Sequence, residues 1–166
     1  MIHHVSLPAK NPEHVAKVLA ELIGGYAGPF IGPFPGAFVA YAEDQFGTGF
    51  EVYPEDVGVF AGEGPEDIGR AGKVDVPQAV AFHALVSVKC DRAKIEEVAT
   101  REGWRCFHNW RGPKGVKLFE LYEFWIENKV MLELATEDML PAYVRLANGP
   151  AQRALLARRT DAAANA

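Results

Sequence analysis

Two histidines and two glutamates recur at matching places in the two halves of this sequence. His4 and His83 each lie in a short apolar run rich in β-branched residues, and Glu51 and Glu133 each lie between apolar residues later in the same half. The histidine and the glutamate are 47 residues apart in the first half and 50 in the second. Such self-similarity indicates a repeated unit in which equivalent positions carry equivalent chemistry.

These four side chains have the chemistry of a metal site. An ionised carboxylate among apolar neighbours is costly unless it is paired or bound to a cation. Two imidazole nitrogens and two carboxylate oxygens suit zinc, nickel, cobalt, iron or manganese better than calcium. If the two halves face one another, we expect His4, Glu51, His83 and Glu133 to converge on one divalent metal ion. Taken singly, each would more often be a hydrogen-bonded histidine or a solvent-facing glutamate.

The first half contains the elements that would position one histidine and one glutamate. Residues 2–7 predict a strand that ends at Pro8. A helix is expected to begin after Asn11, with proline at its first position, and to end at Gly24 and Gly25. Residues 26–36 predict a loop or a poor strand, and residues 37–42 and 48–53 predict a hairpin.

The second half repeats this order. Residues 82–88 predict a strand, Asp91 is placed to cap a helix that ends at Gly103, and three further strands are expected over residues 105–110, 118–126 and 130–135. Residues 54–79 are rich in glycine, proline and acidic residues and predict a linker. Two helices are expected within residues 137–160, divided at Gly149 and Pro150.

This pattern resembles the vicinal oxygen chelate superfamily, which includes glyoxalase I, extradiol dioxygenases, methylmalonyl-CoA epimerase and fosfomycin or bleomycin resistance proteins. The resemblance is carried by the His-x-x-Leu opening at His4, the similar opening at His83, and the turn 44–47 that leads to Glu51. The turn 127–129 before Glu133 departs from it, because it lacks the usual aspartate and glycine. The resemblance covers residues 1 to about 136.

The resemblance implies an α+β fold within one glyoxalase-like domain spanning residues 1–166. Two βαβββ modules, residues 1–53 and 80–136, would form a curved mixed sheet, joined by the linker 54–79 and followed by C-terminal helices over 137–160.

The resemblance also implies an activity. A metal would chelate adjacent oxygens of a small organic substrate, and a glutamate of the metal site, either Glu133 or Glu51, would move a proton next to a carbonyl. This describes a metal-dependent lyase, isomerase or epimerase. Two alternatives stay open, namely a non-catalytic small-molecule-binding protein of the resistance type and an iron-dependent ring-cleaving dioxygenase.

Three further residues are candidates for contact with a substrate. Arg111 lies in a loop rich in glycine and proline and could hold an anionic group, although a solvated arginine is the commoner reading of such a position. Tyr122 and Glu120 share one face of the strand predicted over residues 118–126, with ordinary packing as the alternative for the tyrosine.

Charge and composition restrict the choice of partners. The 166 residues include 17 basic and 22 acidic side chains, a net charge of −5 that argues against a nucleic-acid partner. Cys90 and Cys106 form no CxxC pair, so neither a thiolate zinc site nor a disulfide framework is indicated. No apolar run approaches the roughly 18 residues that span a membrane. We expect a cytoplasmic homodimer that binds a small molecule.

Overall fold

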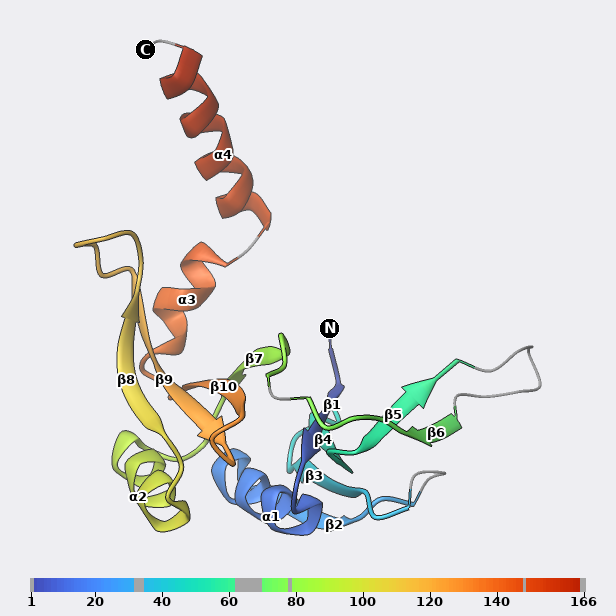
Figure 1. Cartoon of the computed structure of the whole chain (residues 1–166). Coiled ribbons are helices and arrows are strands. Elements are labelled where there is room, and N and C mark those ends of the chain that lie inside the picture. Colours follow the sequence, from blue (N-terminus) through green and yellow to red (C-terminus); the bar gives the residue numbers. More distant parts are fainter. Residues whose placement is uncertain (1, 32–34, 62–69, 78, 148, 165–166) are drawn as a thin grey trace.

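The computed structural model describes residues 2–31, 35–61, 70–77, 79–147 and 149–164, and it contains the same βαβββ unit twice (Figure 1). The first module consists of β1 (His4–Ala9), α1 (Pro12–Ile23), β2 (Gly25–Pro29), β3 (Phe38–Ala42) and β4 (Gly49–Pro54). The second consists of β7 (His83–Ser87), α2 (Arg92–Glu102), β8 (Cys106–Arg111), β9 (Phe119–Ile126) and β10 (Val130–Ala135). The sheet orders are β1-β4-β3-β2 and β7-β10-β9-β8, with the first and last strands of each module parallel. The predicted α+β class and its paired βαβββ modules are confirmed.

The two helices begin and end where their capping residues predict. The Asn11 side chain accepts a hydrogen bond from the backbone N–H of His14 at 3.2 Å, and Asp91 does the same for Lys94 at 2.9 Å. Gly24 and Gly103 end the helices in the left-handed conformation, both at φ +66°. Because each capping contact joins residues close together in the sequence, the sequence was sufficient to predict where α1 and α2 begin and end.

The apolar faces of both helices pack against one face of each sheet. Alternate strand residues, such as Leu7 and Val52 in the first module and Phe124 and Leu132 in the second, are fully buried in a single cluster with Val15 of α1. Figure 1 shows α1 and α2 side by side along this face. The opposite face of each sheet is left to carry the polar residues of the same strands.

The segment between the modules contains more structure than a linker requires. Its strands β5 (Val57–Phe60) and β6 (Arg70–Lys73) form an antiparallel hairpin that the sequence did not predict. Two of its glycines, Gly58 and Gly72, pair with each other across the hairpin, which removes the side-chain alternation that would have indicated strands. β2 is a regular strand where a loop or a poor strand was expected.

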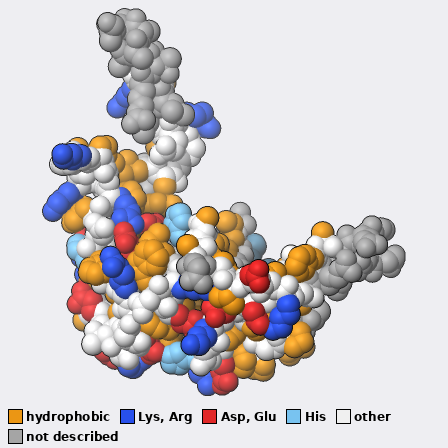
Figure 2. Space-filling model, in the orientation of Figure 1, with side chains coloured by type: hydrophobic (Ala, Val, Ile, Leu, Met, Phe, Trp, Pro, Cys, Tyr) orange, Lys and Arg blue, Asp and Glu red, His pale blue; other side chains and the backbone are white. Residues whose placement is uncertain are grey.

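The C-terminal residues form the two expected helices, α3 (Leu140–Leu146) and α4 (Gly149–Ala164), which extend away from the sheets in Figure 1. Among the described residues, no helix is long and apolar enough to cross a membrane. On the face drawn in Figure 2, acidic and basic side chains of the described residues are interspersed with hydrophobic ones over both modules.

Ion pairs and a shared cap hold the modules together. The Glu127 carboxylate, in the turn between β9 and β10, accepts hydrogen bonds from the backbone N–H groups of Lys10 (2.6 Å) and Asn11 (2.9 Å) at the start of α1. Arg101 of α2 binds both oxygens of Glu21 of α1 at 3.0 and 2.8 Å, and this hydrogen bonding lowers the pKa of Glu21 to about 2. The second module therefore caps the helix of the first.

The β9–β10 turn forms without the aspartate and glycine that the family resemblance leads one to expect. Glu127 (φ +49°) and Asn128 (φ +57°) both adopt the left-handed conformation, as in a type I′ turn. The Asn128 side chain compensates by accepting from the backbone N–H of Arg105 at 2.7 Å and donating to the carbonyl of Gly103 at 3.1 Å. The turn is thus stabilised by contacts distant in sequence.

The substitution Glu127→Gln should lower the free energy of unfolding by about 1 kcal/mol, because it removes the charge at the N-terminus of α1 and one of two acceptors. Chemical denaturation measures this value. Glu97→Gln is a matched control, since Glu97 binds only the side chain of its neighbour Lys94 among the described contacts. Equal effects of the two substitutions would contradict a specific role for Glu127 in joining the modules.

Candidate functional site

The two modules present their histidine and glutamate at the same register. Glu51 on β4 lies opposite Ser6 of β1, and Glu133 on β10 lies opposite Leu85 of β7. His4 and His83 each precede that opposite residue by two positions, so each shares a sheet face with the glutamate of its module. This is the face turned away from the helices. The structure therefore contains two equivalent half-sites.

The half-site of the first module centres on the Glu51 carboxylate, which is held by two hydroxyl groups. The Glu51 side chain is 12% exposed, and its Oε2 accepts hydrogen bonds from the hydroxyls of Ser6 (3.1 Å) and Tyr53 (2.5 Å). Its other oxygen, Oε1, lies 3.6 Å from Nε2 of His4, whose side chain is 55% exposed. Burial, together with the neighbouring Glu51 carboxylate, raises the pKa of Tyr53 to about 12. Tyr53 therefore stays protonated and donates to Glu51.

In the second module a guanidinium compensates the carboxylate. Both Nε (3.1 Å) and Nη2 (2.7 Å) of Arg111 donate to Oε1 of Glu133, which is 14% exposed. The Nη1 of the same arginine lies 2.8 Å from Oε1 of Glu123, the residue directly opposite Glu133 on β9. Burial is the largest influence on Glu123 and opposes its ionisation, but the hydrogen bond and charge of Arg111, together with the hydrogen bond from Asn109, lower the pKa of Glu123 overall. Arg111 thus neutralises one of two facing carboxylates.

The four predicted metal ligands are not gathered in one place. The structure brings His4 and Glu51 together, whereas Glu133 is engaged by Arg111, and Nδ1 of the exposed His83 lies 3.4 Å from the carbonyl of Ala81. Within the described part of the chain, no three His, Cys, Asp or Glu side chains are grouped so that they could hold a metal ion. The imidazole and carboxylate of each half are ligand types that divalent cations use, but neither half gathers three such groups among its described residues and the two halves remain separate.

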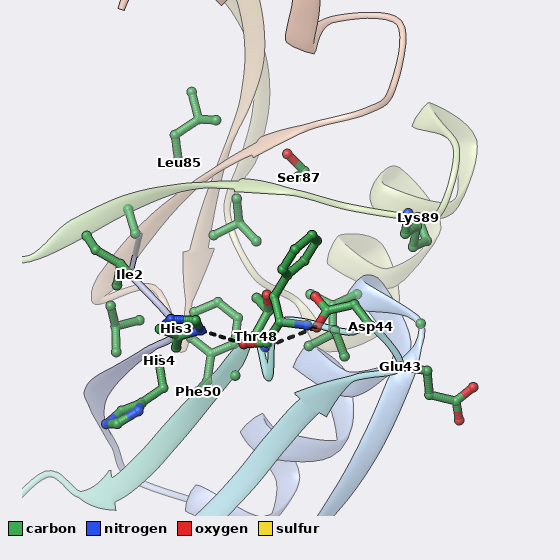
Figure 3. A pocket seen from close by; sticks show the side chains of 18 residues that line it. Ile2, His3, His4, Glu43, Asp44, Thr48, Phe50, Leu85, Ser87 and Lys89 are labelled. Carbon is green, nitrogen blue, oxygen red and sulfur yellow. Dashed lines mark hydrogen bonds between the residues drawn. The ribbon is translucent and has the colours of Figure 1, made fainter. Parts of the chain in front are cut away.

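A cavity of about 480 Å³ lies between the modules (Figure 3). It is bounded by β1, the end of α1, the turn before β4, and β7. Figure 3 shows Leu85 and Ser87 of β7 across the cavity from His3, while the His4 ring turns away from β7. β1 and β7 are edge strands of two separate sheets, and of the four predicted metal ligands only His4 lines the cavity between these strands.

The turn beside this cavity is fixed by its own hydrogen bonds. The Asp44 carboxylate accepts from the backbone N–H groups of Phe46 (2.8 Å) and Thr48 (3.3 Å), and the ring of His3 donates through Nδ1 to the Phe46 carbonyl (2.5 Å). The ring of His3 therefore stabilises the turn, whereas the neighbouring His4 is the predicted metal ligand.

Two of the three predicted substrate contacts lie on the helix side of the second sheet. The buried Tyr122 donates to Glu96 of α2 at 2.5 Å. Glu120 accepts from Arg92 at 2.8 and 3.1 Å and lies 2.6 Å from Nε2 of His108. Both side chains face away from Glu133 and contact α2 and β8, so the structure does not support their predicted contact with a substrate. Of the three candidates, only Arg111 lies in a half-site.

Sequence reasoning did not select Ser6, Tyr53 or Glu123, although each contacts a half-site. Tyr53 is two residues from Glu51 on one strand, and strand alternation alone places both on one face. Ser6 and Glu123 become neighbours through strand pairing, which depends on register. The position of Tyr53 beside Glu51 could therefore have been predicted from the sequence, whereas the positions of Ser6 and Glu123 require knowledge of the strand pairing.

Comparison with solved structures finds similar folds at low identity. A glyoxalase/bleomycin resistance protein/dioxygenase from Alicyclobacillus acidocaldarius is 13% identical with a TM-score of 0.41, over 82% of this chain and 90% of that one. Oxidase ChaP-H2 is 13% identical (TM-score 0.44, covering 82% and 93%), and an integron cassette protein from V. Cholerae is 15% identical (0.45, 82% and 94%). No family model and no curated protein matches the chain.

The paired βαβββ modules are the architecture that the sequence resemblance implied. At these identities and TM-scores the similar structures carry no information about the reaction, so the possible chemistry depends on the two half-sites alone.

The raised pKa of Tyr53 predicts a loss of stability at alkaline pH. Because the folded pKa of about 12 exceeds the ordinary value of 10.0, the folded protein keeps a proton that the unfolded chain has lost, and stability falls as pH rises from 10 towards 12. Urea denaturation from about pH 9 upward should show a smaller decrease for Tyr53→Phe than for the wild type. Tyr26→Phe, at a largely exposed position, should keep the wild-type decrease. Identical pH dependence in all three proteins would rule out this coupling.

Proposed function

We propose that this chain is a metal-dependent enzyme of the lyase, isomerase or epimerase type, acting on a small organic substrate with adjacent oxygens. The observation that supports this most is the repeated half-site, in which one histidine and one glutamate occupy the same register positions on the same face of each module. Two nitrogen and two oxygen ligands that recur at equivalent positions favour binding of one shared divalent cation over a chance occurrence of polar residues on each sheet. The metal ligands proposed are His4, Glu51, His83 and Glu133.

Glu51 is the stronger candidate for the catalytic base. Its Oε2 is held by two hydroxyl groups, which leaves Oε1 beside the imidazole of His4 and available to a proton or a cation. In Glu133, by contrast, Oε1 already accepts two hydrogen bonds from the guanidinium of Arg111. A bound divalent cation would supply polarisation of the substrate oxygens and stabilisation of the enediolate. The protein would supply Glu51 to move the proton.

The cavity between the modules is proposed to bind the body of the substrate; of the four proposed metal ligands only His4 is among its lining residues. Its volume of about 480 Å³ is within the range of sites that bind small organic molecules. Apolar residues such as Val5, Phe50 and Leu85 line most of it, with His3, Ser87 and Lys89 as polar groups. Arg111 remains a candidate for binding an anionic substrate group, whereas Glu120 and Tyr122 are not part of the proposed site.

A second candidate function is a binding protein of the same fold without turnover. Two observations favour it, namely the Arg111–Glu133 ion pair, which already satisfies one predicted ligand, and the largely apolar cavity. Such a protein would bind an apolar ligand with no metal present. Iron-dependent ring cleavage has no specific support in the geometry.

Metal analysis separates the two candidates. The purified protein, incubated with Mn²⁺, Co²⁺, Ni²⁺ or Zn²⁺ and freed of excess ion, should retain about one ion per four-ligand site. His83→Ala should weaken retention at least about tenfold, since loss even of a residue that supports a ligand costs 10- to 100-fold. His108→Ala is the matched control, because His108 lies on the helix side of the same sheet, bound to Glu120. If the protein retains no ion but binds apolar probes, the result would contradict the proposed enzyme and support the binding protein.

We also propose that the chain forms a homodimer, since an exchange of modules between two chains offers a second way to unite the half-sites across the unpaired edges of β1 and β7. Light scattering with and without the retained ion measures the mass. A monomer in both states would restrict the metal site to one chain.

A further inference from the structure

We infer that the segment after β4 forms a second, smaller binding pocket beside the Glu51 half-site, and that this pocket takes an uncharged apolar group of the ligand, about the size of a benzene ring. A cavity of about 220 Å³ lies between β1 and this segment. Its lining includes Ser6 and Tyr53, the two residues whose hydroxyl groups hold Glu51. The inference rests on the proposed function, because it takes Glu51 as part of the reactive site and names one group of the molecule bound there.

Valines of the β5–β6 segment supply much of the apolar lining. Val57 and Val59 alternate along β5, Val74 follows the end of β6, and all three line the cavity together with Pro77. In Figure 1 this segment begins beside β1 and β4. A stretch whose composition predicted only a linker therefore brings three branched apolar side chains to one cavity.

The polar side chains that line this cavity already have partners. The hydroxyl groups of Ser6 (3.1 Å) and Tyr53 (2.5 Å) both donate to Glu51. The Glu55 carboxylate lies 2.8 Å from Nζ of Lys129. A polar group of a ligand would exchange its water for side chains that are already engaged, whereas an apolar group would gain from burial. The lining therefore favours an uncharged apolar group.

The volume of the cavity sets the size of that group. A dry apolar cavity of about 150 Å³ is large enough to bind benzene. The cavity of about 220 Å³ therefore accepts a benzene ring or a branched aliphatic group of similar size. The larger cavity of about 480 Å³ is left for the body of the ligand.

Contacts within the chain fix the outer wall of the pocket. The backbone N–H of Glu55 donates to the carbonyl of Ala9 at 2.9 Å, which joins the start of the segment to the end of β1. The N–H of Val74 donates to the carbonyl of Asp56 at 3.0 Å. Val59 and Val74 are 57% and 37% exposed, so a ligand can enter from solvent without a change in strand pairing.

Benzene is the probe for this pocket, and the methyl groups of the intact chain report where it binds in ¹H–¹³C correlation spectra. Benzene should shift the methyl signals of Val57, Val59 and Val74 until the site is saturated. Val74→Phe fills part of the cavity and should weaken benzene binding at least about tenfold, equivalent to the lost burial of about two methylene groups. Val57→Phe should have the same effect from the other strand, and it serves as the test if Val74→Phe fails to fold.

Val76→Phe is the matched control. Val76 lies two residues after Val74, is 40% exposed, and is not among the residues that line the cavity. The same enlargement of a valine at this position should leave benzene binding unchanged. All variants should retain a divalent ion to the same extent as the wild type, because none of them alters a proposed metal ligand.

The outcomes separate this inference from the proposed enzyme. Saturable shifts of the pocket valines that Val74→Phe or Val57→Phe weakens, and Val76→Phe does not, support the inference. Shifts confined to methyl groups of the larger cavity, such as those of Leu85, or an affinity that neither pocket variant changes, overturn it. Ion retention without benzene binding at the pocket valines overturns only the inference. Benzene binding there without ion retention supports the pocket and contradicts the enzyme.

Discussion

The structure depends on how it compensates glutamates placed in the middle of closely packed strands. A carboxylate at such a position loses most of its hydration and must gain hydrogen bonds or a cation in return. The first module surrounds Glu51 with the hydroxyls of Ser6 and Tyr53 and leaves the His4 imidazole beside it. The second uses the guanidinium of Arg111 for Glu133. The two modules thus meet the same electrostatic requirement in two ways, with hydroxyl groups in the first module and a guanidinium in the second.

The fold places these carboxylates by giving each sheet one covered and one polar face. Both helices pack on the same side, where alternate residues of the central strands form a single core. The other side carries the histidines and glutamates, with β1 and β7 as neighbouring but unpaired edges. Contacts such as Glu127 with the start of α1, and Arg101 with Glu21, fix the modules relative to each other on the helix side. A cavity lies between the edge strands β1 and β7 and is lined by residues of both modules.

Local and periodic signals were enough to predict the modules. Asn11 and Asp91 cap their helices through contacts three residues away, and β10 alternates as its sequence suggests. The sequence showed that a histidine and a glutamate recur in each half, and the convergence of all four on one metal ion stays a prediction. The β5–β6 hairpin was missed because its paired glycines give no alternation. The ion pair between Arg111 and Glu133 could not be predicted, since the spacing of two residues 22 apart does not indicate which strand faces which.

Strand pairing and helix packing, which the sequence does not specify, also explain why Arg111 lies in a half-site while Glu120 and Tyr122 do not. Strand alternation correctly put Glu120 and Tyr122 on one face of β9 and Glu123 on the other, but the sequence did not say which face the helix covers. The answer depends on α2, whose Arg92 and Glu96 bind Glu120 and Tyr122 and so place that face inside the module. Glu123 lies on the other face of β9, and the register of β9 with β10 puts it opposite Glu133, where Arg111 contacts both carboxylates. The covered face of β9 thus depends on α2, and the charge of the half-site depends on strand register.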